Sequence, residues 1–132
     1  MSLIGKQRGK PITKKYFNNI LNKFLVFLKR EIKFNYNIPI VLIDDIEFSK
    51  KYKTFGMMMP DKIIISISNR HPIDILRTVS HEYIHHKQYF EGKRMDGSGG
   101  SKCENEANAK AGEIMRKYAK NHPEFFELTY IH

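Results

Sequence analysis

After a basic segment over 1–12, apolar residues recur along the chain at three- and four-residue steps. That spacing gathers them on one face of an α-helix. We therefore predict a helix over 14–33 whose apolar face belongs to a core, although a cationic helix of this kind also suits a membrane surface. The apolar positions are Phe17, Ile20, Leu21, Phe24, Leu25, Leu28 and Ile32.

The next apolar runs are short and are separated by polar residues, which is typical of strands. They lie over 38–43, 52–59 and 62–68, and the acidic stretch over 44–47 follows the first of them as a polar break. Pro60-Asp61 suits a turn, because proline presets the first torsion and aspartate bonds the local backbone. The second and third strands are therefore predicted to form a hairpin.

The strand over 62–68 has two different faces, because successive side chains point to opposite sides. One face carries Ile63, Ile65 and Ile67, and the other carries Ile64, Ser66 and Ser68. The serines predict a solvent-facing end of the kind that an edge strand has.

Two further helices are predicted after the strands. One spans 72–91, because Pro72 fits the first helical position and Gly92 fits the stop. The other begins near Lys102, runs to about Lys120 and ends before Pro123. Together these elements predict an α+β fold. In it a small three-stranded sheet packs on the second helix, flanked by an N-terminal and a C-terminal helix.

A chain of 132 residues fits one domain. We assign residues 1–12 to a basic tail and 13–132 to a single domain, whose apolar end over 124–132 is expected to pack back onto the body. The single Cys103 excludes a disulfide framework and a cysteine-based zinc site. No signal peptide or membrane-spanning run is visible, so we expect a cytoplasmic protein without membrane insertion.

The net charge is +9, from 23 basic and 14 acidic residues. Such a surface attracts polyanions, and nucleic acid is one possible partner. Because the basic residues are scattered rather than clustered, the charge is equally well explained by solubility.

The motif H-E-x-x-H stands at His81, Glu82 and His85, inside the helix predicted over 72–91. Residues four apart lie on the same side of a helix, so the two histidines can share one metal ion. Glu82 sits beside His81 and can reach a metal-bound water without ligating the metal. His86 points about 100° away from this face and is not expected to be a ligand.

A catalytic zinc site needs three protein ligands and one open position. Glu104 lies 19 residues after His85, which leaves enough chain for the third helix to fold back beside the second. Asn108 is four residues later on the same face, where it can hydrogen-bond a ligand histidine. Glu106 points about 200° away from Glu104, so we favour Glu104 as the ligand and keep Glu106 as the alternative.

The motif and the downstream string over 100–116, Gly-Ser-x-x-Glu-Asn-Glu-Ala-Asn-Ala-x-Ala-Gly-x-x-Met-Arg, carry a resemblance. The combination resembles the gluzincin-type minimal metallopeptidases, including the ImmA/IrrE-like group. It looks closest to small metallopeptidases encoded by bacteriophages. The resemblance covers roughly residues 54–116. The chain lacks the Leu-Leu-Met-Pro ending of the ImmA/IrrE pattern, so repressor cleavage is not implied.

The resemblance implies a zincin-like domain, in which an edge strand lines the cleft and pairs with an extended substrate. Carried over, His81 and His85 are zinc ligands, Glu104 is the third ligand, and Glu82 is the base. The expected function is that of a metalloendopeptidase with one zinc ion per chain, acting on a protein or peptide substrate.

Two other functions stay open: a phage cell-wall peptide hydrolase, and a non-catalytic basic protein that is virion-associated or bound to nucleic acid. A hydrolase of this class also needs a group that stabilises the oxyanion. The candidates are His86, Tyr118, His122 and Tyr130, among which the sequence does not choose.

Overall fold

The long helix α2 (Lys14–Ile32) opens the part of the chain that the computed structural model describes, residues 13–93 and 102–124. Thr13 caps it, since its hydroxyl accepts a hydrogen bond from the N–H of Tyr16 at 3.0 Å. The predicted apolar face is buried in the core, and only Leu25 stays partly exposed. No helix among the described residues is long and apolar enough to cross a bilayer.

The sheet has three strands, as predicted: β1 (Ile40–Ile43), β2 (Gly56–Met59) and β3 (Lys62–Ser66). Its order is β1-β3-β2, with β1 parallel and β2 antiparallel to β3. The prediction that 62–68 is an edge strand is therefore wrong. Alternation placed Ile63, Ile65 and Ile67 correctly on one fully buried face. Ser66 on the other face is also buried, so that end of β3 does not face solvent.

A short helix, α3 (Ile46–Tyr52), stands where the sequence predicted only a polar break. Its acidic residues are helix-start signals: Asp45 caps the helix by accepting from the N–H of Glu47 at 3.0 Å. The helix buries none of its side chains, so it leaves no apolar periodicity to detect. It also explains why β2 begins at Gly56 rather than at Tyr52.

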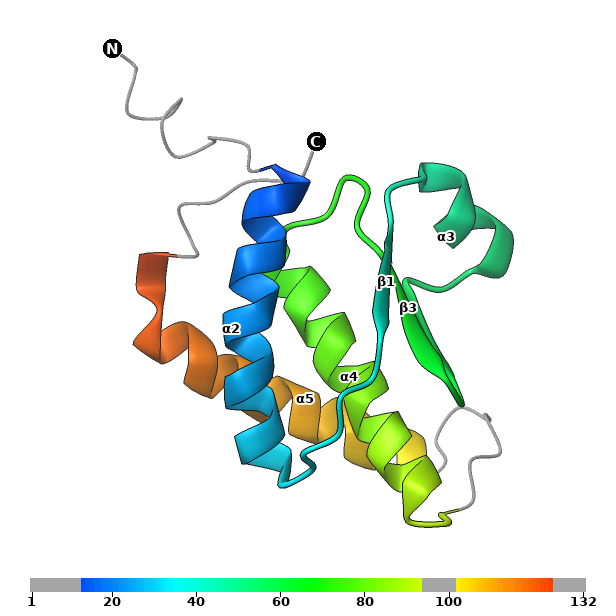
Figure 1. Ribbon diagram of the computed structural model, residues 1–132, viewed down its shortest axis with the longest axis vertical. Coiled ribbons are helices and arrows are strands. Elements are labelled where there is room, and N and C mark those ends of the chain that lie inside the picture. Colours follow the sequence, from blue (N-terminus) through cyan, green and yellow to red (C-terminus); the bar gives the residue numbers. More distant parts are fainter. Residues whose placement is uncertain (1–12, 94–101, 125–132) are drawn as a thin grey trace.

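Helices α4 (Pro72–Phe90) and α5 (Lys102–Asn121) match their predicted spans within two residues. Figure 1 shows α4 in the middle of the fold, between α2 on the left and strands β1 and β3 on the right, with α5 crossing it. Ala107 and Ala111 are buried in the α4–α5 contact, where small side chains let the two helices approach closely. The fold is thus α+β.

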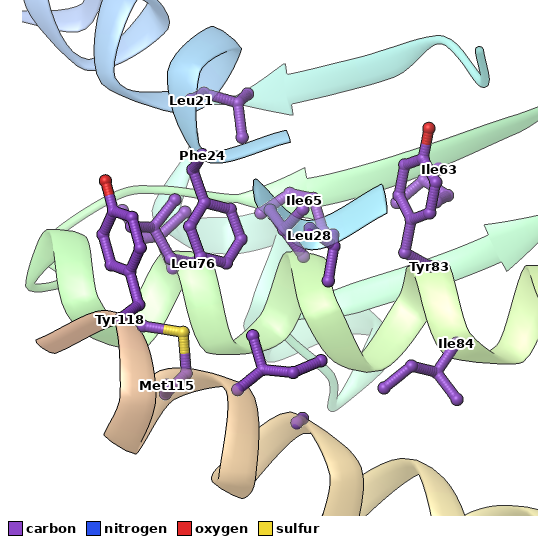
Figure 2. Packing of buried hydrophobic residues seen from close by; sticks show 14 of the residues in the cluster. Leu21, Phe24, Leu28, Ile63, Ile65, Leu76, Tyr83, Ile84, Met115 and Tyr118 are labelled. Atoms are coloured by element: carbon purple, nitrogen blue, oxygen red, sulfur yellow. The ribbon is translucent and has the colours of Figure 1, made fainter. Parts of the chain in front are cut away.

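The core lies between α2, the sheet and α4, and continues to the far half of α5 (Figure 2). Phe24 of α2 meets Tyr118 of α5 edge to face at 4.8 Å. The Tyr83 hydroxyl donates to the carbonyl of Tyr36, just before β1. These contacts hold α4 between its neighbours and so position the residues on its remaining face. The predicted tail over 1–12 and the predicted packing of 125–132 lie outside the described residues.

Candidate metal centre

Three side chains predicted as ligands converge between α4 and α5. His81 and His85 come from successive turns of α4, and Glu104 comes from the first turn of α5. The Nε2 atoms of the two histidines are 3.0 Å apart. One carboxylate oxygen of Glu104 lies 3.1 Å from Nε2 of His81, and the other lies 3.0 Å from Nε2 of His85. This group could hold one metal ion.

The electrostatics at His81 favour its neutral imidazole, the form that binds metals. Burial is the main cause that lowers the pKa of His81, and the neighbouring His85 lowers it further against the opposing effects of Glu104. The side chain of Asn108 hydrogen-bonds His81. Asn108 thus stands where the helical spacing placed it, beside a histidine of the group.

Glu106, the alternative ligand, is directed elsewhere. Its Oε1 accepts from Nε2 of Gln88 at 2.6 Å and lies 3.4 Å from Nζ of Lys93. The Gln88 hydrogen bond is the first cause of a lowered pKa for Glu106, and Lys93 adds to it. The structure therefore joins Glu104, and not Glu106, to the two histidines, in agreement with the predicted helical phase.

Glu82 lies beside the group without belonging to it. Its side chain is 8% exposed. Burial raises the pKa of Glu82 to about 7; His85 opposes that shift and Glu104 adds to it. A carboxyl group with a pKa near neutrality can both take up and release a proton at physiological pH.

Strand β2 forms the wall beside Glu82, and Gly56 makes this close approach possible. A Cβ atom at Gly56 would lie 2.6 Å from Cγ2 of Thr78 and 3.1 Å from Cγ of Glu82. Any larger residue would push β2 away from α4. The sequence pattern assigned Gly56 only to a strand, and a glycine inside a strand is the signal that could have marked it.

Arg70 braces the start of α4, a role that the sequence pattern did not indicate. It donates to the carbonyl of Ser66 at 2.7 Å and to the hydroxyl of Thr78 at 2.6 Å. Its guanidinium lies over the ring of Phe55, 4.3 Å from the centroid. Burial lowers the pKa of Arg70 to about 10 despite the opposing effect of Asp74. No sequence signal identifies such a brace, because its partners come from separate segments of the chain.

Those candidates for oxyanion stabilisation that the structure describes are not brought to the group. Tyr118 packs in the core against Phe24, and His122 stacks on Tyr118 at 4.1 Å, both near the far end of α5. His86 lies against Phe90 at 5.1 Å, away from the metal-binding face as its helical phase predicted. Tyr130 is outside the described residues.

Comparison with known proteins found no relative of this chain. No protein family, curated protein or solved structure matches the chain. The function is therefore inferred from the residues and their geometry.

Proposed function

We propose that this protein is a zinc-dependent metalloendopeptidase with a zincin-like domain. The observation that carries the proposal is the convergence of His81, His85 and Glu104 on one point, with Glu82 held beside them. Two histidines and one glutamate are a ligand set of catalytic zinc sites, which keep a fourth position open. A structural zinc site would instead be closed by a fourth protein ligand.

The spacing of the three ligands supports zinc. Tetrahedral zinc with bonds of about 2.0–2.1 Å separates neighbouring ligand atoms by about 3.3 Å. The separations among the facing atoms here are 3.0, 3.0 and 3.1 Å. Only small side-chain movements are needed to admit the ion, and Asn108 would hold His81 in orientation.

A zinc ion in this position would polarise the scissile carbonyl and make a water molecule more acidic. Glu82 takes the proton from that water and passes it to the nitrogen of the leaving amine. In the metal-free site burial raises the pKa of Glu82 to about 7, and the charge of a bound zinc ion would lower it, which favours the carboxylate form that accepts the proton. Because Glu82 is almost fully buried, the proton is exchanged with the reacting groups rather than with bulk water.

An extended peptide is the substrate that the surroundings favour. Within the described residues, β2 pairs only with β3, so its other edge is available for a further strand. Gly56 brings that strand against Glu82. A peptide that pairs with β2 would pass beside the base, in the mode of β-strand addition.

The test compares wild type with Glu82→Gln, which keeps the shape and removes the base. We expect the variant to fold and keep its zinc while hydrolysis falls on the order of a hundredfold or more. Lys110→Gln, a polar change elsewhere on α5, is the matched control and should cleave like wild type. A protein-derived peptide library and purified peptidoglycan serve as separate substrate pools, which distinguish a protein substrate from a cell-wall peptide. Equal cleavage by wild type and Glu82→Gln would refute the proposal.

A further inference from the structure

The side chain of Gln88 connects the two helices that carry the candidate metal centre. It lies on α4, three residues after His85, and is 1% exposed. Its Oε1 is 2.8 Å from Nδ1 of His85. Its Nε2 donates to the carbonyl of Cys103 at 3.1 Å and to Oε1 of Glu106 at 2.6 Å. Both groups on the nitrogen side come from the first turns of α5.

The orientation of the Gln88 amide follows from these partners. The Cys103 carbonyl and the Glu106 carboxylate are acceptors, so the group facing them must be the amide nitrogen. The reverse orientation would place the amide oxygen against two other oxygens in a buried position. Oε1 of Gln88 therefore faces His85.

That orientation decides which nitrogen of His85 carries the proton. Oε1 of an amide only accepts, so Nδ1 of His85 must donate to it. In the neutral ring the lone pair then belongs to Nε2. This is the atom that faces Nε2 of His81 and the carboxylate of Glu104 at 3.0 Å each.

We propose that Gln88 is a positioning residue that holds His85 in the Nδ1–H tautomer, and that Glu106 orients Gln88 for this task. Glu106, the rival candidate for the third ligand, thereby acts on the metal site only through Gln88 and His85. Lys93, 3.4 Å from Glu106, completes the chain on the solvent side. The proposed ligand Glu104 and the anchor Glu106 are two residues apart on α5, so one turn of this helix supplies both.

The inference rests on the proposed zinc site, but its first measurement needs neither zinc nor hydrolysis. Nitrogen–proton correlation spectra of the histidine rings are recorded on the zinc-free full chain, about two pH units above the usual histidine pKa. We expect wild-type His85 to be the Nδ1–H tautomer. His122 is an internal control, because its Nδ1 lies 3.0 Å from the carbonyl of Tyr118 and should carry a proton in every variant.

Gln88→Met keeps the size of the side chain and removes the acceptor. We expect His85 to lose its preference for Nδ1–H while the His122 signals stay unchanged, and zinc affinity to fall about 10- to 100-fold. The exchange Gln88→Glu with Glu106→Gln again places an acceptor at His85, so it should restore the tautomer. It also sets a carboxylate oxygen against the Cys103 carbonyl, so this double variant should be less stable than wild type. Glu106→Gln alone removes the charge of the anchor but leaves Gln88 in contact with His85 and the Cys103 carbonyl. It should therefore weaken zinc binding less than Gln88→Met does.

An Nε2–H tautomer of His85 in the wild type overturns the inference without any variant. The inference is also overturned if His85 keeps a full preference for the Nδ1–H tautomer in Gln88→Met while the His122 signals are unchanged. If wild type shows the Nδ1–H tautomer but binds no zinc, the proposed function fails and the orientation of His85 by Gln88 stands. If zinc is bound and the tautomer is the other one, the positioning role fails and the zinc site stands.

Discussion

Helix α4 buries two sides of opposite chemistry. One side packs Leu76, Val79 and Tyr83 into the apolar core with α2 and the sheet. The other side places polar and titratable side chains against α5 and β2: Glu82, His85 and Gln88 are buried, and His81 is partly buried. The core side gains free energy from removing apolar surface from water. Burial of the site side offsets part of that gain, because it removes polar groups from water.

The cost of the site side is visible in its pKa values. Burial lowers the pKa of His81 and raises that of Glu82 to about 7, so the charged form of each group is disfavoured. His85 compensates in part by donating a hydrogen bond to Gln88, and His81 does so through hydrogen bonds with Glu104 and Asn108. The apolar side therefore holds α4 in place. The free energy that this side gains from burial offsets the cost of burying the polar residues of the site.

The largest effect on stability should come from the core side. Phe24 is fully buried against Tyr118, whereas Val26 on the same helix is 61% exposed. Phe24→Ala should lower the free energy of unfolding by about 3–5 kcal/mol, because it leaves a cavity. Val26→Ala is the control and should change it by less than about 0.5 kcal/mol. Urea unfolding of both variants measures the difference, and equal losses would contradict this description of the core.

The next effect has the opposite sign and comes from the site side. The pKa of Glu82 rises from an ordinary 4.5 to about 7 on folding, so folding favours the protonated carboxyl. The contribution of protonated Glu82 to the stability of the fold is complete below 4.5, its pKa in the unfolded chain, and is lost as the pH rises through about 7, its pKa in the folded protein. In zinc-free protein above that pH, Glu82→Gln should therefore be more stable than wild type by about 3 kcal/mol.

Urea unfolding of the zinc-free protein as a function of pH measures this gain. The difference between Glu82→Gln and wild type should shrink as the pH falls towards 4.5. Glu113→Gln, a change at an exposed carboxyl on α5, should show no such trend. A difference that stays constant over the whole range would show that the charge of Glu82 does not destabilise the site side.

A smaller effect is expected where β2 meets the site. Gly56→Ala places a methyl group 2.6 Å from Cγ2 of Thr78. Thr78 cannot rotate freely, because its hydroxyl is bonded to Arg70 and to the carbonyl of Asp74. Overpacking of this kind typically costs about 1–3 kcal/mol.

The matched control is the double variant Gly56→Ala with Thr78→Ser, which removes Cγ2 and keeps the hydroxyl. It should recover most of the lost stability in thermal unfolding. If Gly56→Ala is as stable as wild type, the contact between β2 and α4 is looser than the structure has it.

The same division explains how much could be predicted. Apolar periodicity predicted α2, and alternation predicted the buried isoleucine face of β3, because burial of an apolar face is written in the spacing of the residues. Start and stop signals at Pro72, Gly92 and Pro123 predicted α4 and α5. Helical geometry likewise separated Glu104 from Glu106 by the directions in which their side chains leave the helix. Regularity within one element was enough for both.

Features that depend on contacts between two elements could not be predicted from the sequence pattern of either element alone. α3 buries no side chain and leaves no periodic signal. The central place of β3 depends on which strands pair with it, and the roles of Arg70 and Gln88 depend on partners from other segments. Binding of nucleic acid or another polyanion stays a prediction from the charge. A location in the host cytoplasm or in the virion also stays a prediction.

The metal content of purified full-length protein tests the zinc site most directly. Elemental analysis should find about one zinc per chain in wild type. His81→Ala and His85→Ala should each abolish it, and Glu104→Ala should reduce it far more than Glu106→Ala, which leaves all three ligands in place. Full zinc occupancy in both histidine variants, or a greater loss in Glu106→Ala than in Glu104→Ala, would contradict the site described here.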